Sequence, residues 1–580
     1  MKLTDIKSPA DIRSMSVDEL RGLADGLRDI LLTRLAARGG HAGPNLGFLE
    51  PTIALHYVFN TPEDKIVFDV SHQTYVHKML TGRIAAFADP ARYGEVTGYT
   101  NPAESPYDLF ALGHTSTSVG LASGLALARD MRGGKERVVA VIGDGSLSGG
   151  QAFEALDYAA ELRSNFIVVV NDNQMSIAEN HGGLYDDLRA LRESNGTAER
   201  NIFRSLGFDY LYVPYGNDLP SLIEAFRAVK DSTRPVVVHL NTMKGEGYAP
   251  AERNKERFHY TAPFDRTTGD SPAAPEDYTD IFAEHMIERM AADPRLVTIT
   301  AGTPGAIGFG PGRRARVGRQ FVDVGIAEQQ AVSMSAGLAR GGARPVFGVC
   351  STFLQRAYDQ LSQDCGINGQ PAVFNLFYGG VWGMTDSTHL GFFDVPMVAN
   401  IPGFCFLEPT CREEYLAMLD WAIDHATTPT VVRVPGGGIV SRPGDYARDY
   451  SRVEWEQVRQ GREVAIVGAG SFLPLALEAA DLMAADYGVA PAVYNPRRVD
   501  SLDPAAIASL RDCRLVITLE DSAVEGGFGH KVAAALAAAP GAPEVRVLGL
   551  PTAFPDRYRP ADLLASRGLT PAAIAALARP

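Results

Sequence analysis

The chain alternates short runs of β-branched and other apolar residues with helical stretches along most of its length. Runs that are apolar at every position are typical of strands buried on both faces of a sheet. Buried strands joined by helices form parallel sheets covered by helices, so the sequence predicts an α/β protein. The predicted strands are residues 65–70, 137–142, 166–170, 235–240, 297–301, 345–349, 371–377, 430–434, 463–467 and 515–519.

Two polar segments interrupt this alternation, at residues 266–278 and 435–461. Both contain proline or glycine together with charged residues, as linkers between domains do. A chain of 580 residues with 46% hydrophobic content can bury several cores of ordinary size. We therefore expect three domains, each with a mainly parallel sheet covered by helices: residues 1–265, 279–445 and 455–580.

Charge and hydropathy restrict the partners of the chain. Its formal net charge of -15 argues against nucleic acid or an anionic membrane surface as the main partner. The charged N-terminal residues lack a signal-peptide core, and no run is long enough to cross a bilayer, so we expect a soluble cytoplasmic protein. The cysteines show no metal or disulfide spacing and are predicted to be reduced thiols: Cys350, Cys365, Cys405, Cys411 and Cys513.

Polar triplets follow two neighbouring predicted strands. A Gly-Asp-Gly triplet centred on Asp144 ends the run 137–142, and an Asn-Asp-Asn triplet that ends at Asn173 follows the run 166–170. Alone, Gly-Asp-Gly is more often a turn that ends a strand. Together, the Asp144 carboxylate, the Asn173 amide and a carbonyl such as that of Met175 form an octahedral set suited to Mg²⁺ and a diphosphate.

The strand, helix and strand around these triplets resemble the thiamine-diphosphate motif of transketolase-like enzymes. Further runs occur in the order seen in 1-deoxy-D-xylulose-5-phosphate synthases, a branch of that family, and the likeness covers nearly the whole chain. The resemblance implies three α/β domains, with thiamine diphosphate and Mg²⁺ bound between the first and the second. The runs that carry it lie at residues 40–47, 69–78, 113–118, 143–145, 171–176, 326–329 and 351–360.

The same resemblance implies roles for single residues. Glu328 would hydrogen-bond the aminopyrimidine ring, and a carboxylate screened from water has a raised pKa. His41, His72 and His389 would face the reacting carbon, where imidazoles donate or accept protons. Alone, Glu328 would be an ordinary helix-start residue. The implied cofactor-binding residues are Gly113, His114, Thr115, Gly143, Asp144, Gly145, Ser146, Asn173, Met175, Lys244, Glu328 and Phe353, of which Asp144, Asn173 and Met175 are the metal ligands.

Two of the implied roles each have a competing interpretation. Phe353 matches the aromatic residue that stacks on the pyrimidine ring, but an apolar residue at this place also suits a core. Lys244 matches a basic residue near the diphosphate, and a solvated lysine is about as good an interpretation.

The sequence departs from the family where the phosphate of an acceptor would lie. Tyr378 and Gly436 stand where the family has arginines, and Cys350 replaces a family tyrosine. Thr385 stands at a family aspartate position, with Asp386 displaced by one. A charge-assisted contact to a phosphate contributes about 1.5 to 3 kcal/mol to binding. Neither Tyr378 nor Gly436 reproduces the geometry of a guanidinium. As the acceptor, a different aldehyde that is smaller or carries no phosphate is therefore favoured over glyceraldehyde 3-phosphate.

Arginines elsewhere leave open a relocated phosphate site: Arg356 is retained, and Arg497 and Arg498 are further candidates. The favoured function is a carboligase that decarboxylates pyruvate or a related 2-oxo acid and adds the two-carbon unit to an aldehyde. The alternative is a transketolase that takes this unit from a ketose. By analogy with the family we expect a homodimer.

Two hypotheses from other classes are weaker. Gly468-Ala469-Gly470 follows a predicted strand, as in dinucleotide-binding oxidoreductases, but the full glycine spacing is missing. A non-catalytic paralogue would have no reason to keep Asp144, Asn173 and Glu328 together.

Overall fold

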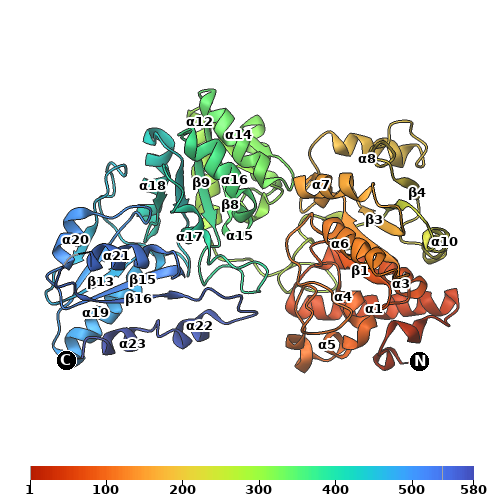
Figure 1. Ribbon diagram of the computed structural model, residues 1–580, viewed down its shortest axis with the longest axis horizontal. Coiled ribbons are helices and arrows are strands. Elements are labelled where there is room, and N and C mark those ends of the chain that lie inside the picture. Colours follow the sequence, from red (N-terminus) through yellow and green to blue (C-terminus); the bar gives the residue numbers. More distant parts are fainter. Residues whose placement is uncertain (1, 539, 580) are drawn as a thin grey trace. The chain divides into compact units, whose positions relative to one another are not determined.

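The computed structural model describes residues 2–538 and 540–579 and divides into two compact units (Figure 1). The first unit comprises Met1–Ala274 with Gly325–Ala327, and the second comprises Pro275–Val324 with Glu328–Pro580. Within the described residues, the first unit holds one sheet and the second holds two. The predicted α/β class is confirmed. The three predicted domain ranges stay a prediction.

The sheet of the first unit is parallel throughout, with strand order β1-β2-β3-β5-β4. Side chains of β2 alternate between two cores: residues 139 and 141 pack in one, and residues 138, 140 and 142 pack in the other. This burial on both faces explains the uninterrupted apolar run. The strands are β1 (Lys65–Phe68), β2 (Val138–Gly143), β3 (Phe166–Asp172), β4 (Asp209–Val213) and β5 (Pro235–Asn241).

Helices of the first unit cover both faces of its sheet. Residues of α1, α3 and α10 share one core with the sheet, and residues of α6 and α7 share the other. The longer helices are α1 (Val17–Arg38), α3 (Leu49–Val58), α6 (Ser118–Met131), α7 (Gly150–Ala159), α8 (Leu184–Glu193) and α10 (Leu219–Val229). The shorter ones are α2 (Ala42–Gly47), α4 (Tyr75–Lys78), α5 (Ala85–Ala88), α9 (Ile202–Leu206) and α11 (Ala249–Arg253).

The second unit contains a six-stranded parallel sheet of order β10-β11-β9-β8-β6-β7 and a five-stranded sheet of order β12-β14-β13-β15-β16. In the latter, β12 pairs antiparallel with β14 and the other pairs are parallel. The strands are β6 (Leu296–Thr300), β7 (Phe321–Asp323), β8 (Arg344–Cys350), β9 (Val373–Phe377), β10 (Cys405–Leu407), β11 (Thr430–Arg433), β12 (Glu456–Arg459), β13 (Val464–Gly468), β14 (Ala492–Asn495), β15 (Leu515–Ala523) and β16 (Glu544–Leu550).

Helices also cover the sheets of the second unit. Next to the six-stranded sheet are α12 (Tyr278–Ala292), α14 (Glu328–Arg340) and α18 (Arg412–His425). Next to the five-stranded sheet are α19 (Leu473–Tyr487), α21 (Phe528–Ala537) and α23 (Pro571–Ala576). The remaining helices are α13 (Pro311–Val317), α15 (Ser351–Leu354), α16 (Tyr358–Gln360), α17 (Asp394–Val398), α20 (Pro504–Leu510) and α22 (Pro560–Ser566).

Each of the predicted strands overlaps an observed strand, but β4, β7, β10, β12, β14 and β16 were not predicted. All of these except β14 lie at sheet edges, and they are short or carry polar residues, so they lack the continuous apolar pattern. The predicted thiols are confirmed: all the cysteines are free, and only Cys513 among them is partly exposed. None of the described helices combines the length and hydropathy that a bilayer crossing requires.

Candidate functional site

The two polar triplets meet at the carboxyl edge of the first sheet. Strands β2 and β3 are neighbours, and the Asp144 amide donates to the Asn171 carbonyl at 3.0 Å. The Asp144 carboxyl is buried and accepts a hydrogen bond from Asn180 Nδ2 at 2.8 Å. Burial, and then the nearby Asp172, raise the pKa of Asp144 to about 8. A cation at this place would favour the charged carboxylate, as a magnesium ligand requires.

The surroundings of Asp144 fit a diphosphate. A Cβ added at Gly143 would have no atom within 4 Å, so open space borders the strand end. Lys244 is buried, and its ammonium group donates to the Ser176 carbonyl at 2.5 Å. Burial lowers the pKa of Lys244 to about 7, with Asp144 acting against this. Within the described chain, Ser176 Oγ and Asn180 Oδ1 are buried without a hydrogen-bond partner. The open space and the Ser176 hydroxyl suit an anionic group, and the Asn180 amide oxygen, which only accepts, suits a cation.

The other predicted residues of this edge lie close in sequence to the same strand ends. Asn173 Oδ1 accepts from the Met175 amide at 3.2 Å, so the two predicted metal ligands belong to one turn. Ser146 is buried, and its carbonyl accepts from Ser116 Oγ at 2.8 Å. A Cβ at Gly145 would lie 2.8 Å from Ser176 Oγ, which explains the second glycine of the triplet.

Loops at this edge hold strained backbone. Val70, Ser71 and Ser116 have φ of 57°, 69° and 74°, values that residues with a side chain rarely adopt. The Asp69 carboxylate accepts from the Ser116 amide at 2.8 Å and from the Ser118 amide at 2.9 Å. Strain of about 1 to 3 kcal/mol per residue persists only where such contacts fix the conformation.

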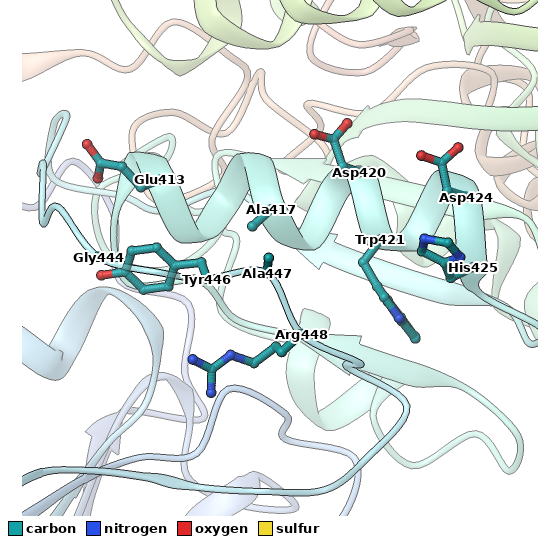
Figure 2. Close-up of a pocket in the computed structure, with 10 residues that line it drawn as sticks. All are labelled: Glu413, Ala417, Asp420, Trp421, Asp424, His425, Gly444, Tyr446, Ala447 and Arg448. Atoms are coloured by element: carbon teal, nitrogen blue, oxygen red, sulfur yellow. The ribbon is translucent and has the colours of Figure 1, made fainter.

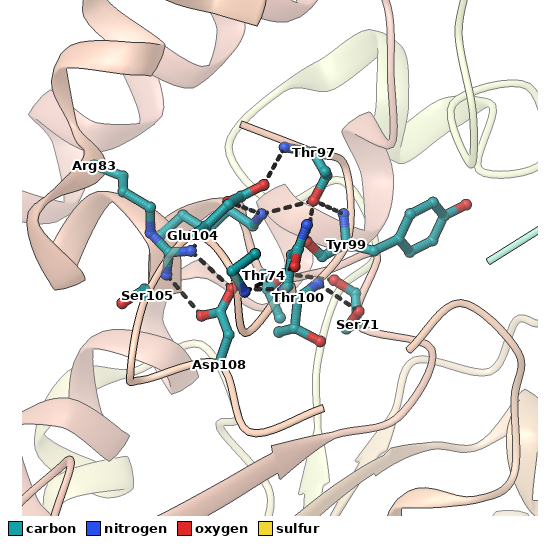
Figure 3. Close-up of polar contacts among 12 residues, drawn as sticks. Ser71, Thr74, Arg83, Thr97, Tyr99, Thr100, Glu104, Ser105 and Asp108 are labelled. Carbon is teal, nitrogen blue, oxygen red and sulfur yellow. Dashed lines mark hydrogen bonds and ion pairs between the residues drawn. The ribbon is translucent and has the colours of Figure 1, made fainter. Parts of the chain in front are cut away.

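A buried ionic network supports the segment that leads to Gly113, His114 and Thr115. Arg83 binds both oxygens of Asp108 at 2.7 Å, and Glu104 accepts from the Thr97 amide at 2.7 Å (Figure 3). Farther along, Ser71 Oγ accepts from the Thr100 amide at 2.8 Å and donates to the Leu112 carbonyl at 2.9 Å. These contacts tie the predicted cofactor loop to the loop that carries His72.

His41 and His72 lie together with a third histidine that the sequence analysis missed. The His259 ring is 5.8 Å from the His41 ring and 5.2 Å from the His72 ring, between centroids. The buried Asn45 amide donates to the carbonyls of His41 and His72, both at 2.7 Å. Burial, followed by the charge of Lys244, holds the pKa of His259 well below its usual range, so this imidazole is neutral.

Neither His259 nor Asn45 has a local signal of the strand-end kind. His259 stands between Phe258 and Tyr260, and the Tyr260 ring is 5.0 Å from the His41 ring. A histidine in an aromatic run was the one available hint.

In the second unit, Glu328 begins α14 and its side chain is buried. Arg356 Nη1 lies 3.3 Å from Glu328 Oε2. Burial raises the pKa of Glu328, and the charge of Arg356 acts in the opposite direction. Glu328 is therefore not a surface residue, and its carboxyl group is screened from water as the predicted role requires.

Phe353 and His389 are neighbours in the same unit, with ring centroids 5.6 Å apart and nearly perpendicular planes. His389 Nδ1 is 3.1 Å from Asp386 Oδ1 and 2.8 Å from Thr388 Oγ1. Burial raises the pKa of Asp386, but the hydrogen bond and charge of His389 outweigh it, and the net pKa is lowered. The aspartate displaced by one position thus still contacts His389.

The positions of the missing arginines are occupied by neutral groups. Tyr378 follows β9 and is 37% exposed, with φ of 57°. The Gly436 amide donates to Ser471 Oγ at 2.8 Å. A Cβ at Gly436 would lie 3.2 Å from the Trp382 ring, and one at Gly437 would also lie 3.2 Å from it. The indole therefore covers the place from which an arginine would start.

The candidate arginines for a relocated phosphate site are already paired, Arg356 with Glu328 as described above. Arg497 contacts Glu414 at 3.2 Å and Glu456 at 2.7 Å. Arg498 contacts Asp500 at 2.5 Å. These carboxylates satisfy both guanidinium groups inside the second unit.

A cavity of about 440 Å³ lies along α18 and residues 444–448 (Figure 2). Its carboxylates have partners: Asp420 is 2.8 Å from His285, and Asp424 is 2.8 Å from Arg289. No predicted site residue lines it, so the cavity lies apart from the proposed chemistry.

Three family models match the chain: 1-deoxy-D-xylulose-5-phosphate synthase at residues 3–201, the transketolase pyrimidine binding domain at residues 275–437 and the transketolase C-terminal domain at residues 453–574. A 1-deoxy-D-xylulose-5-phosphate synthase from Desulforudis audaxviator is 40% identical over 98% of this chain and 95% of that protein. A 1-deoxy-D-xylulose-5-phosphate synthase 1 from Geobacter sulfurreducens is 40% identical over 99% of this chain and 96% of that protein.

These matches extend over nearly the full length and agree with the charged strand ends in the first unit and the buried Glu328 in the second. Families of this kind use thiamine diphosphate with a divalent metal. The chain belongs to the 1-deoxy-D-xylulose-5-phosphate synthase family of thiamine-diphosphate-dependent transferases.

Proposed function

We propose that this enzyme takes a two-carbon unit from pyruvate or a related 2-oxo acid, with release of CO₂, and adds it to an aldehyde. When bound, thiamine diphosphate supplies the nucleophilic carbon and holds the electrons that decarboxylation releases. The observation that carries the proposal is Glu328, a carboxyl group with raised pKa, buried at the start of α14.

The chain's own residues have distinct tasks. Asp144, the Asn173 side chain and the Met175 carbonyl would hold Mg²⁺, and Lys244 would face the diphosphate. Glu328 would share a proton with the aminopyrimidine ring. Phe353 would stack on that ring.

Histidines would manage protons on the substrates. His41 and His72, with the neutral His259 beside them, are suited to donate to or accept from substrate oxygen atoms. His389 would act in the same way from the second unit, with Asp386 fixing its ring.

We further propose that the aldehyde acceptor carries no phosphate. Tyr378 and Gly436 offer no cation, and Trp382 covers the start of any arginine at position 436. Each of the candidate arginines, Arg356, Arg497 and Arg498, is engaged by a carboxylate. An uncharged aldehyde avoids the cost of burying a phosphate without a partner.

The test is to incubate the purified protein with thiamine diphosphate, Mg²⁺, ¹³C-labelled pyruvate and a matched pair of acceptors, D-glyceraldehyde and glyceraldehyde 3-phosphate. We expect CO₂ and a labelled ketose, with the greater kcat/KM for the free aldehyde. Turnover that depends on a ketose and releases no CO₂ from pyruvate would decide for a transketolase. A preference for glyceraldehyde 3-phosphate would refute the unphosphorylated acceptor but leave the carboligase.

A homodimer is part of the proposal. The first unit exposes large apolar side chains on α6 and α7: Leu127 is 42%, Met131 82%, Phe153 38% and Tyr158 51% exposed. Such a group of apolar side chains is typical of a surface that a second copy covers. Sedimentation of Met131→Glu tests this, since the charged variant should shift the protein toward monomer. The cytoplasmic location stays a prediction.

A further inference from the structure

The loop that carries His389 has no regular secondary structure of its own. It leaves β9 and is closed at its base by a hydrogen bond from the Gly380 amide to the Gly391 carbonyl, at 2.8 Å. Between these glycines, residues 381–390 form no helix or strand. The position of His389 therefore depends on contacts that the loop makes with other parts of the second unit.

Tyr558, in the segment between β16 and α22, makes one group of these contacts. Its hydroxyl donates to the Val381 carbonyl at 3.1 Å and lies 3.5 Å from the Met384 carbonyl. Its ring is 5.7 Å from the Phe392 ring, between centroids. One side chain thus donates to one carbonyl of the loop, lies beside a second and packs just beyond the loop's end.

Asp556 makes a second contact from the same segment. Its Oδ1 accepts from the Ser387 amide at 3.1 Å, two residues before His389. The following residues complete the connection, since Thr388 Oγ1 and Asp386 Oδ1 both contact His389 Nδ1. The Ser387 amide lies between these two residues, so fixing it also fixes the partners of the imidazole.

We propose that Asp556 and Tyr558 form a strap that positions His389. They are positioning residues: they act on the loop backbone, and the backbone sets the direction of the imidazole. The inference rests on the role of His389 under the proposed function. It adds that this role depends on the segment that follows β16 of the five-stranded sheet. Without the strap, the loop would sample further conformations and His389 would be less often in place.

The first test reads the loop without activity. The chain has 3 tryptophans, and Trp382 is the one in the loop, so ¹⁹F spectra of 5-fluorotryptophan-labelled protein report it beside Trp421 and Trp455 as internal references. We expect Tyr558→Phe, which removes the donor to the loop, and Asp556→Ala, which removes the acceptor for the Ser387 amide, to shift or broaden the Trp382 resonance only. The matched control is Tyr487→Phe, which removes a hydroxyl bound by Arg579 at 3.1 Å in the same unit.

The second test is a double-mutant cycle on kcat/KM for the aldehyde. We expect Tyr558→Phe to lower it about ten-fold in the native background and less than about two-fold in a His389→Ala background, because the two residues act as one unit. The melting temperature should stay within a few degrees. Asp556→Ala, which removes the acceptor for the Ser387 amide, should repeat the pattern.

The outcomes separate the two proposals. An unchanged Trp382 resonance, or equal losses in both backgrounds, would overturn the strap while the proposed function stands. Full activity in His389→Ala would show that His389 has no role in the reaction, and it would overturn the proposal that the strap serves catalysis. If the native enzyme showed no turnover with any acceptor, the proposed function would fail, and the fluorine spectra would still decide whether the strap holds the loop.

Discussion

Two carboxyl edges of parallel sheets, one in each unit, differ in what their strand ends offer. In the first unit, β2 and β3 end in Asp144 and Asn173, with Lys244 buried nearby. In the six-stranded sheet, β9 and β11 are followed by Tyr378 and Gly436, with no charge at either position. The edge that fits the shared cofactor keeps its charged groups, whereas the two positions at which the family would hold an acceptor phosphate are neutral. One scaffold can therefore change its acceptor without changing its cofactor.

The largest expected effect concerns the group common to every reaction of the family. Glu328→Ala should lower turnover by roughly 10²- to 10⁴-fold, the range of a general acid–base residue, because the aminopyrimidine loses its proton partner. Steady-state kinetics with saturating cofactor measures this. The matched control is Glu284→Ala, which removes a surface carboxylate that pairs with Arg313 at 2.8 Å. Wild-type rates from the Glu328 variant would refute its role.

The next effect concerns the charged edge itself. Asp144→Asn should weaken Mg²⁺-dependent binding of thiamine diphosphate by about 100-fold, because magnesium affinity follows the charge of its ligands. Titration calorimetry with and without Mg²⁺ measures this change. Asp157→Asn, on the exposed side of α7, is the control and should bind as the native chain does. Equal affinities in both variants would place the metal elsewhere.

The third prediction reverses the change at the neutral edge. Tyr378→Arg with Gly436→Arg should raise kcat/KM for glyceraldehyde 3-phosphate relative to D-glyceraldehyde by about ten-fold or more. Since a side chain at position 436 starts 3.2 Å from the indole, Trp382→Ala is included to admit the second arginine. Trp382→Ala alone is the control. An unchanged ratio would mean that an acceptor phosphate, if bound, is held by other residues.

The sequence predicted the strands that have a continuous apolar pattern and the residues that directly follow such strands. Strands such as β2 were found because burial on both faces makes every position apolar, whereas β16 at a sheet edge alternates with charged residues and was missed. Asp144 and Asn173 were found because each directly follows a recognisable strand.

Residues that meet only through the fold were not predictable. His259 joins His41 across more than 200 positions, and Asn45 acts through two backbone carbonyls, which no spacing reveals. The pairing of Arg497 with Glu414 was equally invisible, so the sequence left Arg497 open as a candidate for a relocated phosphate site. Contacts that only the folded chain brings together decided each of these cases.

The smallest expected effect concerns Asp521, a buried carboxyl of the second unit that resembles Asp144. Burial raises the pKa of Asp521 to about 8, and the charge of Arg433 acts in the opposite direction. Its Oδ1 accepts from the Val381 amide at 2.8 Å, and its buried Oδ2 has no partner in the described chain. A pKa raised on folding gives stability that is complete below about pH 4 and lost as pH rises through 8. The native chain should therefore unfold more easily at pH 8.5 than at pH 6.

Asp521→Asn keeps the acceptor for Val381 and removes this titration, so the difference in unfolding free energy between pH 6 and pH 8.5 should shrink by about 1 to 2 kcal/mol. Urea unfolding at both pH values, with EDTA present and cofactor absent, measures it. Asp562→Asn, an exposed carboxylate on α22, should leave the difference unchanged. If Asp521→Asn also left the difference in unfolding free energy unchanged, Arg433 would already hold Asp521 charged. The two edges would then differ in how they balance a buried carboxylate: a bound cation would balance Asp144 at the first edge, and Arg433 would balance Asp521 at the second.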